Sequence, residues 1–382
     1  MNTHKLKKVV VTGKPIFIER RQELFAAMSR YYASIEMITP TSEWYDHKAI
    51  RIILKLFYGL RVFSLSKADS LLSKNKQEFI SKSINIERQI RQLEYSPDIV
   101  FHIFSMFSPL WENFDLLFVM YLDYTMALSE QNWPDWAFFV NSQERDSWIE
   151  CEQKVYEQAY HIFVMSTIVK NSLVQDYGIN AKKITVVGVG YSINYSANEP
   201  DKNKKKFGNK QVLFNSSDFF RKGGDIVFKA FKKVKISMPD AKLVLIGKKI
   251  NPLTISHIDG VENRGKISSV EEMRNLFMET DLVVAPARAE PFGIFLVDAM
   301  ENGVPCIMTA GNGNGMPEFV ENWVDGVVIP QPDPELIANA IIELLNDPEK
   351  LSLMSQAAIY KTKTTFNWDN IAKKIVDVLE NL

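Results

Sequence analysis

The sequence predicts an α/β protein made of two doubly wound halves, each built on a parallel sheet. Short, continuous apolar runs alternate with helix-like segments along most of the chain. Such runs are typical of parallel strands that helices cover on both faces. The alternation stops at residues 197–206, which hold almost no apolar side chains, and then restarts. We therefore predict two halves of similar size joined by a surface linker.

Nine segments have the length and composition of buried strands. Helical spacing of apolar residues fills the intervals, most clearly in residues 142–160, 166–177 and 224–236. Asp333-Pro334 and Asp347-Pro348 mark helix starts, because Asp caps a helix and Pro suits its first turn, and a last helix runs from about Trp368. The predicted strands are residues 9–12, 99–104, 116–122, 161–165 and 184–188, and then 212–214, 242–247, 281–286 and 304–309.

Composition excludes several protein classes. The chain has 382 residues, 46% of them apolar and 24% charged, enough to bury two cores. Its 45 Lys and Arg balance 46 Asp and Glu, so no global charge points to nucleic acid. Cys151 and Cys306 are the two cysteines, which fits a reducing cytoplasm better than a disulfide-stapled secreted domain. We expect no signal peptide and no membrane span, since the apolar runs are too short.

The most specific segment is residues 290–300 (EPFGIFLVDAM), directly after the predicted strand 281–286. Gly293 would let backbone approach a ligand, and a helix opening there would offer free N–H groups to an anion. Glu290 and Asp298 would then flank one phosphate-sized pocket, which suits a nucleotide sugar. A plain strand–turn–helix connection with a surface Glu and a capping Asp fits the spacing equally well.

Two other turns are candidates for the same site, which we expect in the cleft between the halves, beyond the carboxyl ends of the strands. Arg221 and Lys222 precede two glycines at the start of the predicted helix 224–236, as in a phosphate clamp. A solvated helix start is the alternative, although cations there oppose the helix dipole. Residues 310–318 form a glycine-rich turn whose backbone could wrap a sugar or phosphate, or simply be a flexible loop.

In this order and spacing, the three segments resemble the C-terminal half of retaining glycosyltransferases of family 4, which have the GT-B fold. The resemblance covers residues 210–382 well, and the N-terminal half mainly through its alternation and residues 176–188. It implies two Rossmann-like domains facing across a cleft. It also implies transfer of a hexose from a UDP- or GDP-linked sugar to an acceptor hydroxyl, in polysaccharide or glycolipid synthesis.

The resemblance assigns roles to individual residues. Lys222 and Arg221 would neutralise the donor diphosphate, Glu290 would face the donor sugar, and Asp298 would hold the ribose. The other implied donor-binding residues are Phe292, Gly293 and Ile294 for phosphate and sugar, Gly265 and Lys266 for the base, and Gly315 of the glycine-rich turn. On the acceptor side the candidates are Gly13 of the first loop, Asp123 after the strand 116–122, and His102.

Some positions depart from the family pattern. Asp298 stands where Glu is usual, Ser217 replaces a usual Arg, and residues 12–15 lack the usual glycine-rich sequence. We expect no metal, because no Asp-x-Asp occurs and the five histidines show no paired ligand spacing. No cofactor is expected beyond the donor itself. Fixed cations and helix N-termini would stabilise the leaving diphosphate instead.

Residues 47–62 predict a basic amphipathic helix with four fixed cations, no acid and many large apolar side chains. Such a helix can lie on an anionic membrane, whereas a core-packed helix with one basic face is the alternative we favour. We expect a cytoplasmic protein, with this segment as the candidate for peripheral contact with the inner face of the membrane.

The expected domains are residues 1–196 on the acceptor side, a linker at 197–207, a donor domain at 208–366, and a terminal helix at 367–382 that packs back on the N-terminal domain. The expected partners are a nucleotide-sugar donor and a carbohydrate or lipid-linked acceptor, and not nucleic acid. Three alternatives share the scaffold: a sugar phosphorylase, a UDP-sugar epimerase, and a catalytically decayed subunit that only binds nucleotide sugars.

Overall fold

The computed structural model of the chain describes residues 7–40, 48–192, 205–251, 258–311 and 313–381. Residues 197–204 of the predicted linker and His47 of the predicted basic helix lie outside these ranges. The chain divides into two compact units. Unit 1 comprises Met1–Val187 with Ala372–Leu382, and unit 2 comprises Gly188–Ile371. The last helix, α15 (Trp368–Glu380), therefore begins in unit 2 and ends in unit 1.

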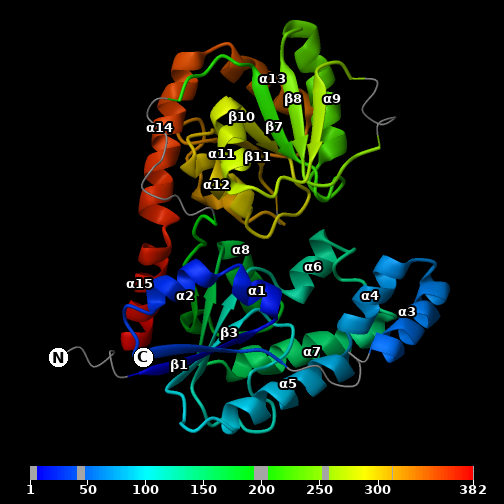
Figure 1. The fold of residues 1–382 in the computed structure, drawn as a ribbon, viewed down its shortest axis with the longest axis vertical. Coiled ribbons are helices and arrows are strands. Elements are labelled where there is room, and N and C mark those ends of the chain that lie inside the picture. The colour runs from blue at the N-terminus through cyan, green and yellow to red at the C-terminus, as the bar shows by residue number, and fades with distance from the viewer. Residues whose placement is uncertain (1–6, 41–47, 193–204, 252–257, 312, 382) are drawn as a thin grey trace. The chain divides into compact units, whose positions relative to one another are not determined.

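Unit 1 is built on a six-stranded parallel sheet in the order β2-β1-β3-β4-β5-β6 (Figure 1). Its central strands β3 and β4 are buried at every residue, as their continuous apolar runs predict. The chain passes from β1 to one edge and returns through β3 to the other, so the strand order reverses between β1 and β3. The strands are β1 (Lys8–Gly13), β2 (Ser34–Ile38), β3 (Ile99–Ile103), β4 (Phe118–Leu122), β5 (His161–Val164) and β6 (Ile184–Val186).

Several helices of unit 1 begin at polar residues whose side chains accept hydrogen bonds from free backbone N–H groups. The side chains of Asn75 and Asn141 accept from the N–H groups of Glu78 and Glu144, which starts α5 and α7. The helices are α1 (Pro15–Glu19), α2 (Gln22–Met28), α3 (Lys48–Val62), α4 (Leu65–Ser73), α5 (Lys76–Arg91), α6 (Met126–Asn132), α7 (Ser142–Gln158) and α8 (Thr167–Gln175).

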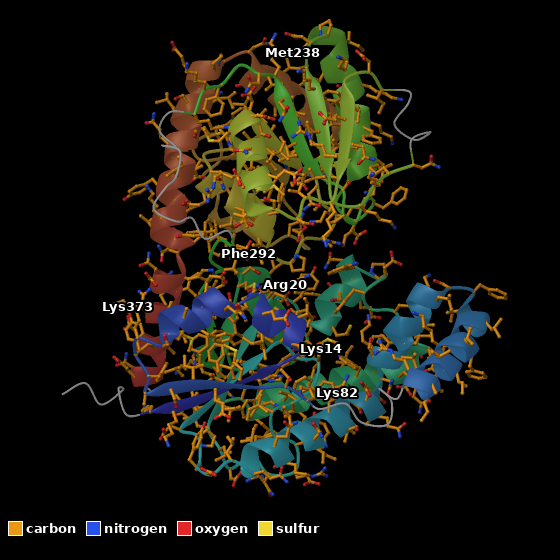
Figure 2. The ribbon with its side chains drawn as sticks, viewed as in Figure 1. Lys14, Arg20, Lys82, Met238, Phe292 and Lys373 are labelled. Atoms are coloured by element: carbon orange, nitrogen blue, oxygen red, sulfur yellow. The ribbon has the colours of Figure 1, made fainter. Side chains whose placement is uncertain are left out.

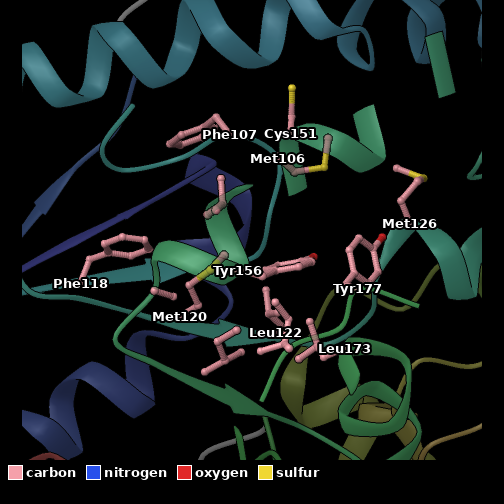
Figure 3. Packing of buried hydrophobic residues seen from close by; sticks show 14 of the residues in the cluster. Met106, Phe107, Phe118, Met120, Leu122, Met126, Cys151, Tyr156, Leu173 and Tyr177 are labelled. Atoms are coloured by element: carbon pink, nitrogen blue, oxygen red, sulfur yellow. The ribbon is translucent and has the colours of Figure 1, made fainter. Parts of the chain in front are cut away.

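One apolar core of unit 1 lies between the sheet and the helices α5 and α7 (Figure 3). Phe118, Met120 and Leu122 project from one face of β4 into this core, as the two-residue period of a strand requires. The buried carboxylate of Glu152 accepts hydrogen bonds from Tyr177 Oη at 2.5 Å and Ser105 Oγ at 2.7 Å. These donors are what allows a carboxylate to lie inside the apolar core.

Unit 2 is built on a second six-stranded parallel sheet, in the order β12-β11-β10-β7-β8-β9. Here the strand order reverses between β7 and β10. The strands are β7 (Gln211–Asn215), β8 (Lys242–Ile246), β9 (Val261–Gly265), β10 (Leu282–Ala285), β11 (Cys306–Thr309) and β12 (Val327–Ile329). The helices are α9 (Gly224–Ser237), α11 (Val270–Glu279), α12 (Ile294–Glu301), α13 (Pro334–Leu345) and α14 (Pro348–Thr365).

The two predicted parallel sheets are confirmed, and so is each predicted strand. The predicted helix starts at Asp333 and Asp347 are confirmed as well, because both side chains accept hydrogen bonds from the first turns of α13 and α14. The sequence analysis missed β2, β9 and β12. All three are edge strands, and β2 and β9 are largely exposed or half-buried, so neither shows a continuous apolar run.

Candidate functional site

In unit 2, the two turns that carry the predicted phosphate-binding residues are in direct backbone contact. Residues 218–224 follow β7 and residues 286–293 follow β10, at the reversal of strand order. The N–H of Arg288 donates to the carbonyl oxygen of Arg221 over 2.8 Å. Gly223 has a φ of 78°, and a Cβ there would lie 2.1 Å from the carbonyl oxygen of Pro286. Only glycine fits, and the contact lies where open α/β sheets bind ligands.

Glu290 links the two turns through ion pairs. Its Oε2 lies 2.6 Å from Lys222 Nζ and 3.4 Å from a terminal nitrogen of Arg221. Arg221 also donates to the carbonyl oxygen of Ala289 at 2.5 Å and to the carboxylate of Asp218 at 2.7 Å. The side chains of Arg221, Lys222 and Glu290 are 13%, 15% and 20% exposed. The cluster is therefore shielded from bulk water but still reaches the surface.

The electrostatics keep Glu290 ionised. Burial opposes ionisation, but attraction to Lys222 and Arg221 and their hydrogen bonds outweighs it, so the pKa of Glu290 lies below its ordinary value. The two cations are balanced by Glu290 and by Asp218, whose side chain is 44% exposed. An anion arriving at Lys222 and Arg221 would have to share them with these carboxylates.

Arg288 forms a second bridge between the turns, and the sequence analysis did not single it out. Its guanidinium donates to both carboxylate oxygens of Asp225 at 2.8 Å, and to the carbonyl oxygen of Phe220 at 2.5 Å. This pairing lowers the pKa of Asp225. A lone Arg after a strand carries no sequence signal for such a bridge, because its partners lie more than sixty residues away.

The predicted helix start at Gly293 is confirmed. Gly293 caps α12 with a φ of 94°, and its carbonyl oxygen accepts from the N–H of Leu296 at 2.8 Å. The first N–H groups of a helix have no partner within it, so Ile294 and its neighbours present donors beside Glu290. Phe292 is buried against Phe319 and Phe366, which anchors the turn from below.

The glycine-rich turn joins the same site through backbone pairing. Glu290 N–H donates to the carbonyl oxygen of Gly313 at 2.9 Å, and Gly315 N–H donates to that of Glu290 at 3.2 Å. The buried amide of Asn314 donates to the carbonyl oxygens of Ala287 and Thr309. The three separate sequence motifs thus converge around Glu290, with Gly315 beside it.

Asp298 lies one turn inside α12 and is buried. Its two carboxylate oxygens accept from the backbone N–H and the hydroxyl of Ser192, each at 2.7 Å. The sequence analysis missed Ser192, which lies 106 residues before Asp298. A ribose that reached Asp298 would meet a carboxylate already engaged by one N–H and one hydroxyl.

Gly265 and Lys266 stand at the carboxyl end of β9, two strands beyond β7 in the sheet. Gly265 is held there by a hydrogen bond from the N–H of Gly247 at 2.8 Å, and Lys266 is exposed. Like the turns around Glu290, both residues lie at the carboxyl ends of strands of this sheet. Their contact with a nucleotide base stays a prediction.

In unit 1, the predicted acceptor-side residues gather near the reversal of strand order. Gly13 and His102 lie on the paired strands β1 and β3, and half-buried Asp123 follows β4. His102 is fully buried, and its ring nitrogens bond Thr12 Oγ1 and the carbonyl oxygen of Phe107, each at 2.7 Å. Burial lowers its pKa to about 3. This placement gives His102 a packing role, and its contact with an acceptor stays a prediction.

Two further properties concern only the part of the chain that the structure describes. There, no group of three or more His, Cys, Asp or Glu side chains is arranged to hold a metal ion. Within the same residues, no helix combines the length and apolar character needed to span a bilayer.

Part of the chain is similar to a known protein family. Residues 196–361 match the family of glycosyl transferases group 1. Over 182 residues the chain is 28% identical to the GDP-mannose-dependent monoacylated alpha-(1-6)-phosphatidylinositol monomannoside mannosyltransferase of Corynebacterium glutamicum. That alignment covers 44% of this chain and 47% of the relative, so the chain spans about half the length of this relative.

Solved structures match the whole chain in fold. Sucrose-phosphate synthase from Thermosynechococcus elongatus has a TM-score of 0.67 at 16% identity, and the match covers 98% of each chain. Anabaena Alr3699/HepE, solved in complex with UDP, has a TM-score of 0.63 at 16% identity and covers 99% of this chain and 100% of its own. The match to the group 1 glycosyltransferases thus covers most of unit 2 of this chain, and the two parallel sheets together with the solved structures show that the chain has the GT-B fold.

Proposed function

We propose that this chain is a retaining glycosyltransferase of family 4 that moves a hexose from a UDP- or GDP-linked sugar to an acceptor hydroxyl, without a divalent cation. The observation that carries the proposal is the Lys222–Glu290–Arg221 cluster, which lies beside the N-terminus of α12 at the reversal of strand order in unit 2. A diphosphate can be bound where cations and the free N–H groups of a helix N-terminus converge.

The proposed reaction needs no protein nucleophile. The bond between the anomeric carbon and the diphosphate oxygen breaks, and the acceptor oxygen bonds to that carbon from the same face. The acceptor proton passes to the departing diphosphate oxygen. Negative charge therefore develops on the diphosphate, where Lys222, Arg221 and the N–H groups after Gly293 would stabilise it. Glu290 holds both cations in position and would face the sugar hydroxyls.

The donor class draws support from two other features. Asp298 accepts an N–H and a hydroxyl hydrogen bond from Ser192, and a ribose hydroxyl could take the place of the latter. The relative from Corynebacterium glutamicum is named as GDP-mannose-dependent, and Anabaena HepE was solved with UDP. We further propose a cytoplasmic location, because the buried thiols Cys151 and Cys306 are both free.

A thermal-shift panel of UDP, GDP, ADP and their sugars, with and without EDTA, tests the proposal. We expect UDP or GDP to raise the melting temperature equally with and without EDTA. Lys222→Ala should lose most of this shift, whereas Lys232→Ala, an exposed lysine on α9, should keep it. The absence of any nucleotide shift in the wild type would refute the donor assignment, and a shift abolished by EDTA would refute metal independence.

One observation favours a second candidate, a subunit that binds nucleotide sugars without turning them over. Both carboxylate oxygens of Asp298 are already engaged by Ser192. Donor binding with neither transfer nor slow donor hydrolysis would favour this candidate over the enzyme. Measurable hydrolysis that Lys222→Ala abolishes would exclude it.

A further inference from the structure

Helix α3 (Lys48–Val62) carries its apolar stripe on the outside. Ile53, Phe57 and Leu60 are 66%, 59% and 75% exposed, and Ile52 and Leu56 are also more than half exposed. These residues recur at the three- and four-residue spacing of one helix face. In an ordinary surface helix this face would be buried, so the predicted alternative of a core-packed α3 does not hold for this stripe.

The opposite side of α3 is the side that packs. Gly59 is buried, Leu54 and Tyr58 are half-buried, and the most extensive packing of α3 is against α4. A Cβ at Gly59 would lie 2.8 Å from the side chain of Leu65, so the two helices approach closely there. Figure 1 shows α3 and α4 at the periphery of unit 1, away from its sheet. The outward stripe is therefore fixed by the α3–α4 pair.

The stripe continues beyond the end of α3. Phe63 is 95% exposed and has a φ of 50°, a backbone conformation that is unfavourable for a bulky residue. Leu65, the first residue of α4, is 54% exposed. The left-handed Phe63 ends α3, because the next N–H, that of Ser64, donates to the carbonyl oxygen of Gly59 at 3.2 Å, and it leaves its aromatic ring in solvent beside the apolar stripe. We call Ile52, Ile53, Leu56, Phe57, Leu60 and Phe63 the α3 face.

The segment that carries this face is basic in sequence. Residues 48–68 contain five Lys and Arg and no acid. Lys14, which precedes α1, lies near Lys82 and Arg51. Burial and the charges of Lys82 and Arg51, partly offset by Glu78, lower the pKa of Lys14 to about 8. Figure 2 shows Lys14 and Lys82 in the same part of unit 1. The segment that carries the α3 face thus brings cations and no acid to this part of unit 1.

We propose that the α3 face docks this protein onto an anionic lipid bilayer, lying in the interface with its apolar side chains among the acyl chains. Large apolar side chains flanked by cations are the features that hold a helix at such an interface. A second copy of the chain fits less well, because two such faces would bring the same cations together. The proposal does not depend on the donor site, which lies in unit 2.

Vesicle co-sedimentation tests the proposal. The full chain should bind vesicles of phosphatidylcholine with phosphatidylglycerol, and bind far less to phosphatidylcholine alone or at high salt. Replacing Phe57, Leu60 and Phe63 by Ser should weaken binding about tenfold or more, because each removes a large apolar group from the interface. The matched control is Ile236→Ser with Leu353→Ser, two exposed apolar residues of unit 2, which should leave binding unchanged.

Three results would overturn the proposal. The wild type could fail to bind anionic vesicles, or the triple variant could bind as well as the wild type. Alternatively, light scattering could show that the wild type is a dimer and the triple variant a monomer, while neither protein binds lipid. The α3 face would then be a contact between two copies of the chain. The nucleotide-induced thermal shift of each variant shows that the fold is intact and separates this outcome from failure of the donor site.

Discussion

The two sheets of this protein have the same reversal of strand order but different side chains at that point. In unit 2, the reversal between β7 and β10 holds Arg221, Lys222 and Glu290, charged and partly exposed. In unit 1, the reversal between β1 and β3 holds His102, which is neutral and fully buried. The same topology thus provides a possible binding position in each unit, and the side chains at each reversal decide what that position can bind.

The largest effect should come from removing charge in unit 2. Lys222→Ala should lower kcat about 10²–10³-fold, the usual cost of losing one electrostatic donor to a leaving group. The fold should persist, because Arg221 still bonds Glu290 and Ala289. Transfer or donor hydrolysis at saturating nucleotide sugar measures it, with Lys232→Ala as the control. Wild-type turnover in Lys222→Ala would remove unit 2 from the chemistry.

The corresponding change in unit 1 should affect stability instead. His102→Ala deletes two buried hydrogen bonds and an edge contact with the ring of Phe107, whose centroid lies 4.9 Å away. We expect the free energy of unfolding to fall by about 2–4 kcal/mol. Urea denaturation measures the loss, and the nucleotide-induced thermal shift should remain. A variant with wild-type stability and no activity would reverse the assignment of His102 to packing.

Lowering the pH should reduce the contribution of His102 to stability before it reduces that of Glu290. Burial lowers the pKa of His102 from 6.5 to about 3, so between these values the unfolded state binds a proton that the folded state excludes. The contribution of neutral His102 is complete above pH 6.5 and falls by at most about 1.4 kcal/mol per pH unit below it. The contribution of ionised Glu290, whose pKa is lowered, begins to be lost only below its ordinary value of 4.5.

The measurement is the difference in unfolding free energy between wild type and His102→Gln as a function of pH. This difference should shrink steadily as the pH falls through 6.5, because only the wild type loses the contribution of a neutral His102. Other titrating groups cancel in the comparison. A difference that stays constant down to the acid transition would show that His102 can be protonated in the folded state.

The smallest effect should come from the bridge between the turns of unit 2. Arg288 is 44% exposed, so solvent screens its pair with Asp225, and Arg288→Gln should cost about 0.5–1 kcal/mol of stability. The KM for the donor should rise a few-fold while kcat changes little, since Arg288 positions the turns without joining the Glu290 cluster. A drop in kcat as large as that of Lys222→Ala would place Arg288 in the charge cluster itself.

The interior of the fold could be predicted because its strands are uniformly apolar. β3, β4 and β7 follow directly from their runs of Val, Ile, Leu and Phe. The edge strand β9, with sequence VENRG, could not be predicted, because one side of an edge strand faces solvent and its residues are mixed. The candidate site divides in the same way. Local spacing predicts Gly293 as a helix start. Ser192 and Arg288 could not be predicted, because each belongs to the site through a hydrogen bond to a residue distant in sequence.

The sequence by itself determined two parallel sheets, the helix starts, and the three turns that carry charge and glycine. These depend on local properties: apolar runs that must be buried, side chains that cap N–H groups, and backbone positions that only glycine can occupy. Only the tertiary structure decided which of these turns meet, that Ser192 engages Asp298, that His102 is buried, and that the apolar stripe of α3 faces outward. Each of these depends on which distant segment fills the neighbouring space, and no local pattern encodes that.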